Sequence, residues 1–243
     1  MRQTPWALIT GASGEIGQAI AIQLAAQGVP LYLHYFQSPY KLEPIISFCQ
    51  ERGVPYALVQ ADLRNPIAIS DMYNQLLIKP LLLVNNASID HLGVIQDVSP
   101  SLFDELVSTN VRSAFFMTQA ALTAMIQEQY GRIVNVSSIW GLTGGSCEVL
   151  YSLTKGAINS FTKALAKEVA RSGITVNAVA PGAIDGGMME RFSLEEKQEI
   201  AEDIPMGRLG QPAEIASLVS FLLSREASYI TGQVISPNGG WYT

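Results

Sequence analysis

Residues 6–17 read Trp-Ala-Leu-Ile-Thr-Gly-Ala-Ser-Gly-Glu-Ile-Gly. The apolar run from Trp6 to Thr10 predicts a short buried strand, and Ile16 to Gln27 has the apolar spacing of a helix. Between them, the backbone N–H groups of a glycine-rich turn and the dipole of the following helix favour an anion. The turn has TGxxxGxG spacing and lacks the Lys-Ser/Thr pair of a triphosphatase loop. A plain tight connection is the alternative, but the strand–turn–helix context favours a dinucleotide site.

The alternation of apolar runs and helical patterns continues along the chain. We expect further helices over Tyr40–Arg52, Leu102–Gln129 and Leu150–Ser172, and further strands over Pro30–Tyr35, Val54–Gln60, Leu81–Val84, Arg132–Val136 and Ile174–Ala180. Strands separated by helices imply right-handed crossovers and a parallel sheet. The sequence therefore predicts an α/β fold with one domain over residues 1–243, a Rossmann-like doubly wound parallel sheet flanked by helices on both faces.

The segment after Pro181-Gly182 departs from this alternation. We expect residues 182–210 to form a helical flap beside the site, with Ser193 to Glu196 matching the capping-box pattern of a helix start. The methionines of this segment are interpreted mainly as packing residues. Met188 is nevertheless a candidate substrate contact.

Composition excludes several classes of function. Of 243 residues, 48% are hydrophobic and 15% charged, which is typical of a globular chain, and the formal net charge of −6 argues against nucleic-acid binding. Cys49 and Cys147 lie far apart and are interpreted as small buried hydrophobes, and His34 and His91 have no ligand partners, so no metal site is expected. No apolar run is long enough for a membrane span. We expect a cytoplasmic protein that acts on a small molecule.

A tyrosine and a lysine form the candidate proton donor. Among the 9 tyrosines, only Tyr151 has a lysine four residues later, Lys155, and this spacing places both on one helix face. A cation beside a phenol lowers its pKa toward neutral pH, which would make Tyr151 a general acid or base, whereas a surface helical pair is the alternative. Ser137-Ser138 ends the preceding strand, so a serine hydroxyl and the phenol could converge on one carbonyl oxygen.

Three polar features accompany this pair. Asn110 lies in an otherwise apolar helical pattern, where its amide needs a buried partner or a water. Asp62 follows the third predicted strand and either accepts from an adenine amino group or caps a loop. Asn85-Asn86-Ala87 ends the fourth predicted strand, at the edge of the sheet where ligands bind.

Together these motifs resemble the short-chain dehydrogenase/reductase family over nearly the whole chain. The matches are Thr10 to Gly17, Asn85 to Ala87, Asn110, Ser138, Tyr151 to Lys155 and Pro181-Gly182, while Ser88 replaces a usual glycine. The resemblance implies that Ser138 polarises a carbonyl, Tyr151 donates a proton, Lys155 holds the cofactor ribose and Asn110 organises a relay water. It also implies that the cofactor-binding residues are Gly11, Ser13, Glu15, Ile16, Gly17, Tyr35, Asp62, Leu63, Asn86, Ala87, Tyr151, Lys155, Pro181, Gly182 and Ile184.

The choice of cofactor depends on the end of the second predicted strand. Members that use NAD usually carry an acidic residue there, but this chain reads His34-Tyr-Phe-Gln-Ser38. The arginine common in NADP-dependent members is also absent, and the phosphate turn carries Glu15. We expect NADP, with NAD as the alternative.

Within the family, the broad resemblance is to 3-oxoacyl-acyl-carrier-protein reductases. The segments Ser137 to Gly141, Ser146 to Tyr151 and Asn238 to Trp241 look more like the reductases of the 5-aminopentanone group on elongation factor P. Gln129 and Ser172 stand where carrier-protein reductases tend to have basic residues, although Arg132 and Arg171 could compensate.

The aminopentanone resemblance implies a substrate with a terminal ammonium, attached to a protein. Glu148, three residues before Tyr151, could pair with that ammonium or could instead stabilise the start of its helix. Trp140 is a further candidate contact. The resemblance also implies a homotetramer in which helices 102–129 and 150–172 pair across a two-fold axis. A nucleotide-sensing protein without catalysis is the remote alternative, but it would not need the tyrosine and lysine.

Overall fold

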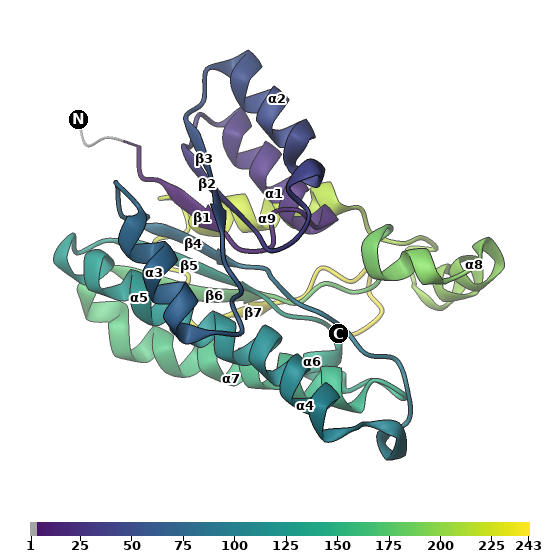
Figure 1. Ribbon diagram of the computed structural model, residues 1–243. Helices are drawn as coiled ribbons and strands as arrows, with labels where there is room; N and C mark the ends of the chain where they lie inside the picture. Colours follow the sequence, from purple (N-terminus) through teal and green to yellow (C-terminus); the bar gives the residue numbers. More distant parts are fainter. Residues whose placement is uncertain (1–3) are drawn as a thin grey trace.

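Seven strands form one parallel sheet with the order β3-β2-β1-β4-β5-β6-β7, in a computed structural model that describes residues 4–243 (Figure 1). The predicted α/β fold is confirmed. The order reverses between β1 and β4, and ligands of such sheets bind at this crevice, beyond the carboxyl ends of the strands. The strands are β1 (Ala7–Ile9), β2 (Leu31–Tyr35), β3 (Tyr56–Gln60), β4 (Leu82–Asn85), β5 (Gly131–Val136), β6 (Ile174–Val179) and β7 (Val234–Ile235).

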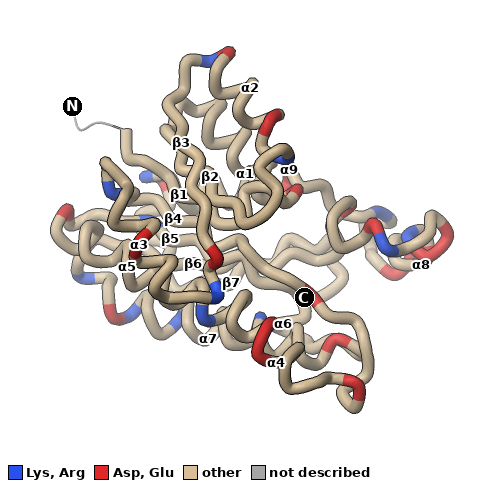
Figure 2. The backbone as a smooth tube through the Cα atoms, in the orientation of Figure 1, with Lys and Arg blue, Asp and Glu red and all other residues tan. Residues whose placement is uncertain are grey.

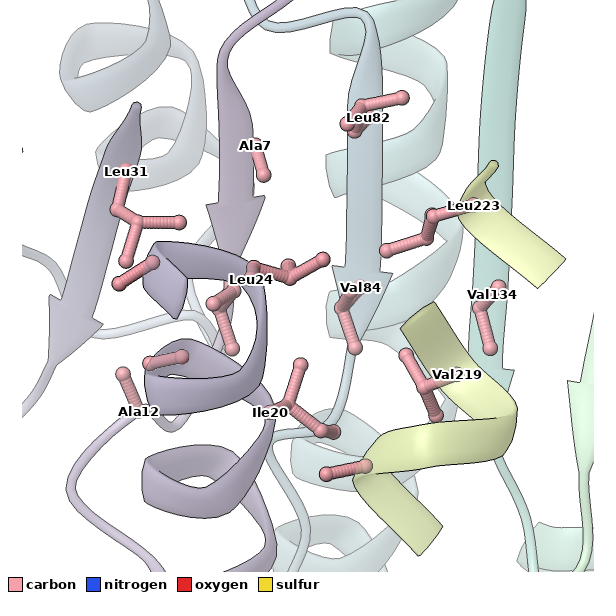
Figure 3. Close-up of a cluster of buried hydrophobic side chains, with 14 of the residues drawn as sticks. Ala7, Ala12, Ile20, Leu24, Leu31, Leu82, Val84, Val134, Val219 and Leu223 are labelled. Atoms are coloured by element: carbon pink, nitrogen blue, oxygen red, sulfur yellow. The ribbon is translucent and has the colours of Figure 1, made fainter. Parts of the chain in front are cut away.

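Helices cover both faces of the sheet, which explains why β1, β4, β5 and β6 are buried along their whole length. One face is covered by α1 (Glu15–Ala26), α2 (Glu43–Arg52) and α9 (Pro212–Leu223). The other is covered by α3 (Pro66–Gln75), α5 (Ser113–Gln127) and α7 (Val149–Val169). Figure 3 shows the first layer: Ile20 and Leu24 of α1 and Val219 of α9 pack on Val84. This packing holds the phosphate turn at the edge of the sheet.

Several predicted elements have other bounds in the structure. The single helix predicted over Leu102–Gln129 is divided into α4 (Pro100–Val107), a π-helical turn (Ser108–Arg112) and α5. The third strand begins at Tyr56 and not at Val54. The π-turn carries Asn110, whose amide bonds to groups outside the helix, and such turns recur at functional sites.

Other elements were not predicted. Helix α3 begins after Asn65, whose side chain accepts from the N–H of Ile67, and α9 begins after Gln211 in a capping box with Glu214. Strand β7 has only two residues, too few for a periodic signal. The prediction that both cysteines are buried was right for Cys49 and wrong for Cys147, which is exposed.

The flap predicted over 182–210 projects from the sheet at the carboxyl ends of the strands (Figure 1). It contains a 3₁₀ turn, η5 (Gly187–Arg191), and α8 (Leu194–Asp203), and the predicted capping box of Ser193 and Glu196 is confirmed. In the view of Figure 2, acidic and basic residues are interspersed along α8 and do not form one basic face. No helix within residues 4–243 is long and apolar enough to cross a membrane.

Candidate active site

A cleft of about 760 Å³ opens at the carboxyl edge of the sheet. This volume is in the range that holds a cofactor together with a small substrate. The cleft wall combines the phosphate turn, the loop after β4, the end of β5, the amino-terminal part of α7 and the flap. Most of the predicted site residues line it: Gly11, Ser13, Glu15, Ile16, Gly17, Asn86, Ala87, Ser138, Trp140, Glu148, Tyr151, Lys155, Pro181, Gly182, Ile184 and Met188.

The phosphate turn depends on two glycines. Gly11 has a φ of +63°, and a Cβ there would lie 2.8 Å from the Cα of Ala87. A Cβ on Gly17 would lie 2.4 Å from the carbonyl oxygen of Gly11. The N-cap of α1 is Gly14, which provides no side-chain acceptor for the first N–H groups of the helix. These free donors and the helix dipole fit the pyrophosphate of a dinucleotide.

Asn86 and Thr10 hold the turn against the loop after β4. The Asn86 side-chain amide donates to the carbonyls of Thr10 and Gly11, at 3.0 Å each. In return, the hydroxyl of Thr10 accepts from the backbone N–H groups of Asn86 and Ala87. The Asn-Asn-Ala motif therefore shapes the cofactor end of the cleft.

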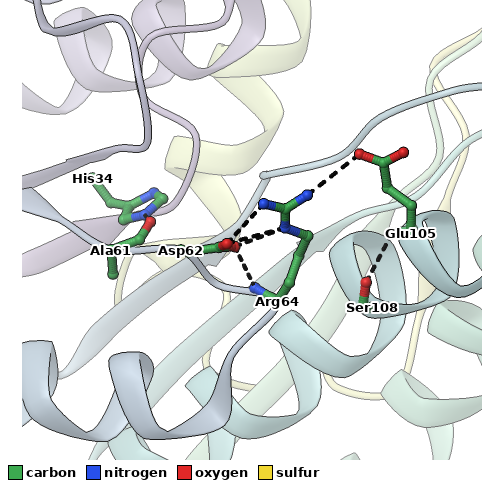
Figure 4. A network of polar contacts seen from close by, with 6 residues as sticks. All are labelled: His34, Ala61, Asp62, Arg64, Glu105 and Ser108. Atoms are coloured by element: carbon green, nitrogen blue, oxygen red, sulfur yellow. Dashed lines mark hydrogen bonds and ion pairs between the residues drawn. The ribbon is translucent and has the colours of Figure 1, made fainter.

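His34 also supports the turn, a role that the sequence did not indicate. Its Nδ1 accepts from the N–H of Gly11 at 3.1 Å, and its Nε2 lies 3.1 Å from the carbonyl oxygen of Ala61 (Figure 4). An Nδ1 that accepts and an Nε2 that donates define a neutral imidazole. Burial lowers the pKa of His34 to about 4, so the ring stays neutral at physiological pH. His34 thus links the phosphate turn to the end of β3.

Asp62 is paired with Arg64 and does not line the cleft. The Arg64 guanidinium donates to both carboxylate oxygens and also approaches Glu105 at 3.4 Å (Figure 4). These hydrogen bonds hold the pKa of Asp62 below its usual range. Tyr35 and Leu63 likewise do not line the cleft. The adenine contact predicted for Asp62 stays a prediction, and its loop-capping role is present, since the N–H of Arg64 donates to it at 3.0 Å.

Tyr151 lies at the inner end of the cleft and is buried. Ser138 and Ser88 line the cleft with it, and both partly oppose the rise of the Tyr151 pKa. The neighbouring Ser137 donates to the carbonyl of Lys155 at 3.2 Å, which leaves Ser138 as the hydroxyl beside Tyr151. Ser138 and Tyr151 thus line one cleft, and the convergence of their hydroxyls on one carbonyl oxygen stays a prediction.

The expected direction of the Tyr151 pKa was wrong. Burial raises this pKa, the charge of Glu148 raises it further, and the hydrogen bonds to Ser138 and Ser88 only partly oppose this. Helical spacing indicated the nearby cation but not the loss of water around the phenol. A phenol with a raised pKa is protonated at neutral pH, as a proton donor must be.

Lys155 is 3% exposed, and its ammonium lies 5.4 Å from the centroid of the Tyr151 ring. It donates to the carbonyl of Val136 at 3.0 Å, and its remaining donors have the cleft beside them. Burial lowers the pKa of Lys155 to about 7. A buried ammonium with spare donors fits the ribose hydroxyls of a nicotinamide cofactor.

Asn110 is buried and does not line the cleft. Its Oδ1 accepts from the N–H of Ile89 at 2.9 Å, and its Nδ2 donates to the Ile89 carbonyl and to the Thr154 hydroxyl. The predicted buried partners are thus present. Asn110 joins the loop after β4 to α7, and the relay water assigned to it stays a prediction.

The flap contacts the opposite wall of the cleft at two places. Arg191 of η5 forms an ion pair with Asp90 of the loop after β4. The backbone at Gly186 lies directly against the Glu15 carboxylate, so a side chain at this glycine would collide with it. These contacts hold the flap over the site.

Glu148 forms the outer wall of the cleft together with Trp140. Although Glu148 is the N-cap residue of α7, its side chain makes no capping hydrogen bond. Burial, the larger effect, raises the pKa of Glu148, and the Trp140 side chain partly opposes this rise. The acidic residues that line the cleft outnumber the basic ones: Glu15, Asp90, Glu148 and Asp185 against Lys155 and Arg191.

Comparisons with known proteins agree with this geometry. A family model described as enoyl-(acyl carrier protein) reductase matches residues 11–242. An uncharacterized oxidoreductase of Bacillus subtilis, YmfI, is 49% identical over 97% of this chain and 98% of its own. The 3-oxoacyl-[acyl-carrier-protein] reductase FabG of Staphylococcus aureus is 37% identical over the whole of both chains.

A solved structure is similar over almost the same length. The crystal structure of a 3-oxoacyl-[acyl-carrier protein] reductase from Brucella melitensis has a TM-score of 0.92 and 31% sequence identity, covering 98% of this chain and 91% of that one. The chain therefore belongs to the short-chain dehydrogenase/reductase family, and it is an NAD(P)-dependent enzyme that acts on a carbonyl or alcohol group.

Proposed function

We propose that the enzyme reduces a ketone to a secondary alcohol with NADPH. The observation that carries this proposal is that Tyr151 and Ser138 line the same cleft as the phosphate turn. Two hydroxyls that converge on one point suit a single carbonyl oxygen, and hydrogen bonds there stabilise the charge that develops on it. The nicotinamide, when bound, supplies the hydride for the carbonyl carbon.

Residues of the chain then supply the proton for the carbonyl oxygen. Ser138 donates a hydrogen bond to the carbonyl oxygen, and Tyr151 transfers its phenolic proton to the same oxygen as the alcohol forms. Lys155 binds the ribose hydroxyls and stabilises the phenolate that Tyr151 becomes. Asn110 would position a water that returns a proton to the site.

NADPH is the proposed cofactor because no carboxylate at the end of β2 would repel a 2′-phosphate. Phe36, the first residue after β2, lines the cleft and has the Arg64 guanidinium 5.3 Å above its ring. Arg64 already binds Asp62 and Glu105, so any preference for the phosphate would be modest.

For the substrate, we infer the 5-aminopentanone group carried on a lysine of elongation factor P. A ketone with a terminal ammonium suits the acidic lining of the cleft and the half-buried Glu148. The alternative is a 3-oxoacyl group on acyl carrier protein, which the names of several relatives support equally. The buried Arg132 is not available to an acidic carrier, because its guanidinium bonds to the carbonyls of Gly131, Gly173 and Ser224.

The test compares elongation factor P bearing the amino ketone with acetoacetyl carrier protein, by following NADPH oxidation. We expect the modified elongation factor to be reduced with the higher kcat/KM, and Glu148→Gln to lower only that value. Much faster reduction of the carrier-bound thioester would overturn the aminopentanone proposal. Full activity of Glu148→Gln on the amino ketone would overturn the role of Glu148.

We further propose a cytoplasmic homotetramer in which α5 and α7 pair between copies. Phe115 of α5 and Leu153 of α7 are 47% and 52% exposed, and such apolar surface on two neighbouring helices suits a two-fold interface. Light scattering at micromolar concentration tests this, since a monomeric mass would contradict it.

A further inference from the structure

The carboxyl-terminal segment forms a tight turn beside the cleft. The N–H of Trp241 donates to the carbonyl of Asn238 at 3.2 Å, and the two residues between them, Gly239 and Gly240, have φ values of +65° and +86°. A turn with positive φ at both central positions is of type I′, which glycine adopts without strain. The Asn-Gly-Gly-Trp sequence therefore determines the direction in which Trp241 leaves the turn.

Hydrogen bonds and close packing hold this turn in place. The Asn238 side chain donates to the Ser236 hydroxyl and the Tyr242 carbonyl, and its oxygen accepts from the N–H of Gly240. The carbonyl of Gly239 accepts from the N–H of Met206, at the end of the flap. A Cβ on Gly239 would lie 2.6 Å from a methyl carbon of Ile204. Trp241 is thus held in place by the segment that covers the active site.

Trp241 lines the cleft and packs on Trp140. The two rings meet edge to face, with centroids 5.3 Å apart and planes at 61°. Glu148 lines the cleft with them, and the Trp140 side chain affects the pKa of its carboxylate. Two indoles and one carboxylate, from positions up to 101 residues apart, therefore form one corner of the cleft, which we name the Trp140–Glu148–Trp241 corner.

The chemistry of this corner favours an organic cation. Tryptophan has the strongest cation–π attraction of the aromatic side chains, and a neighbouring carboxylate adds charge of the right sign. Within residues 4–243, the Lys and Arg residues that line the cleft are Arg191, which is paired with Asp90, and Lys155, which donates to the carbonyl of Val136. A purely apolar wall would not need the half-buried carboxylate of Glu148.

We propose that Trp241 is a specificity-determining residue that contacts the alkylammonium end of the substrate, with Trp140 and Glu148 completing its binding site. This inference rests on the proposed reduction of an amino ketone and adds the residue that selects it. The carboxyl-terminal turn then acts on substrate choice and not on proton transfer, since Tyr151 donates the proton from the inner end of the cleft.

The experiment uses two ketones of the same shape. One is the (4-oxopentyl)trimethylammonium ion, which cannot cyclise to an imine, and the other is its neutral isostere, 6,6-dimethylheptan-2-one. kcat and KM are measured with NADPH for the wild type, Trp241→Leu, Trp241→Phe and the control Tyr242→Leu. Tyr242 adjoins Trp241 but does not line the cleft.

We expect the wild type to prefer the cation, and Trp241→Leu to lower kcat/KM for the cation by roughly 3- to 30-fold through KM, the range expected for a cation–π contact. The neutral ketone should change less than about twofold, Trp241→Phe should retain part of the preference, and Tyr242→Leu should behave as wild type. If Trp241→Leu lowers both ketones equally, or neither, Trp241 does not select charge and the inference is overturned. If the wild type itself shows no preference for the cation, the result contradicts the proposed amino-ketone substrate, and with it the function on which this inference rests.

Discussion

Replacing His34 tests whether a neutral imidazole supports the phosphate turn. The ring is 2% exposed, and it accepts from the N–H of Gly11 while bonding to the carbonyl of Ala61. Protonation of Nδ1 would remove the acceptor for Gly11 and place an unpaired charge in the core. His34→Asn keeps a polar side chain of similar reach but cannot titrate.

The size of the expected loss of stability follows from the pKa of His34. Burial lowers the pKa of His34 to about 4, against 6.5 in the unfolded chain. Between these two pH values the unfolded state therefore binds more protons than the folded state. The stability that depends on the neutral His34 ring is complete above pH 6.5 and is lost as the pH falls toward 4. For one site with these pKa values, the free energy of unfolding decreases by about 2 kcal/mol at pH 5 and about 3 kcal/mol at pH 4.

Urea unfolding of the wild type and His34→Asn, at one protein concentration from pH 7.5 to 5, measures this loss. We expect the variant to be less stable than the wild type at pH 7.5. Between pH 7.5 and 5, however, its free energy of unfolding should fall by about 2 kcal/mol less than that of the wild type. The carboxylates are common to both proteins, so their contribution cancels in this difference. The chain has 2 histidines, so NMR can also assign and titrate the His34 ring directly. Parallel pH profiles within about 0.5 kcal/mol, or a His34 resonance that titrates near pH 6.5, would refute the reasoning.

Three further predictions concern turnover. Tyr151→Phe should lower kcat by ~10²–10⁴-fold with little change in the cofactor Kd, and more than a tenth of wild-type activity would contradict the assignment of Tyr151 as the proton donor. Lys155→Ala should lower kcat and also weaken cofactor binding. NADPH should give only a modestly higher kcat/KM than NADH, since Arg64 beside Phe36 is already bound to Asp62 and Glu105, and equal or reversed values would count against NADPH. Asp90→Asn removes the ion-pair partner of Arg191 and should raise KM by about two- to fivefold, because a partly exposed pair contributes up to ~1 kcal/mol. An unchanged KM would show that this pair does not hold the flap.

Features set by neighbours in sequence could be predicted without the structure. The apolar run before Gly11, the glycine spacing and the helical pattern after Ile16 identify a strand, a turn and a helix through local geometry alone. Likewise, the four-residue spacing of Tyr151 and Lys155 places both on one face of α7, and both line the cleft. Strand β7 could not be predicted, because its two residues are too few to show a periodic pattern.

The sequence by itself thus determined the α/β fold class and the phosphate turn, and it indicated the reacting pair, because spacing along a strand or helix sets which side chains share a face. Only the tertiary structure decided which distant residues meet. His34 contacts Gly11 and Ala61 across 23 and 27 residues, and Trp241 reaches Trp140 from the end of the chain. Burial is also a tertiary property, which is why the pKa of Tyr151 rises where its neighbouring lysine alone predicted a fall. Long-range packing removes water from a side chain, and no local pattern records that loss.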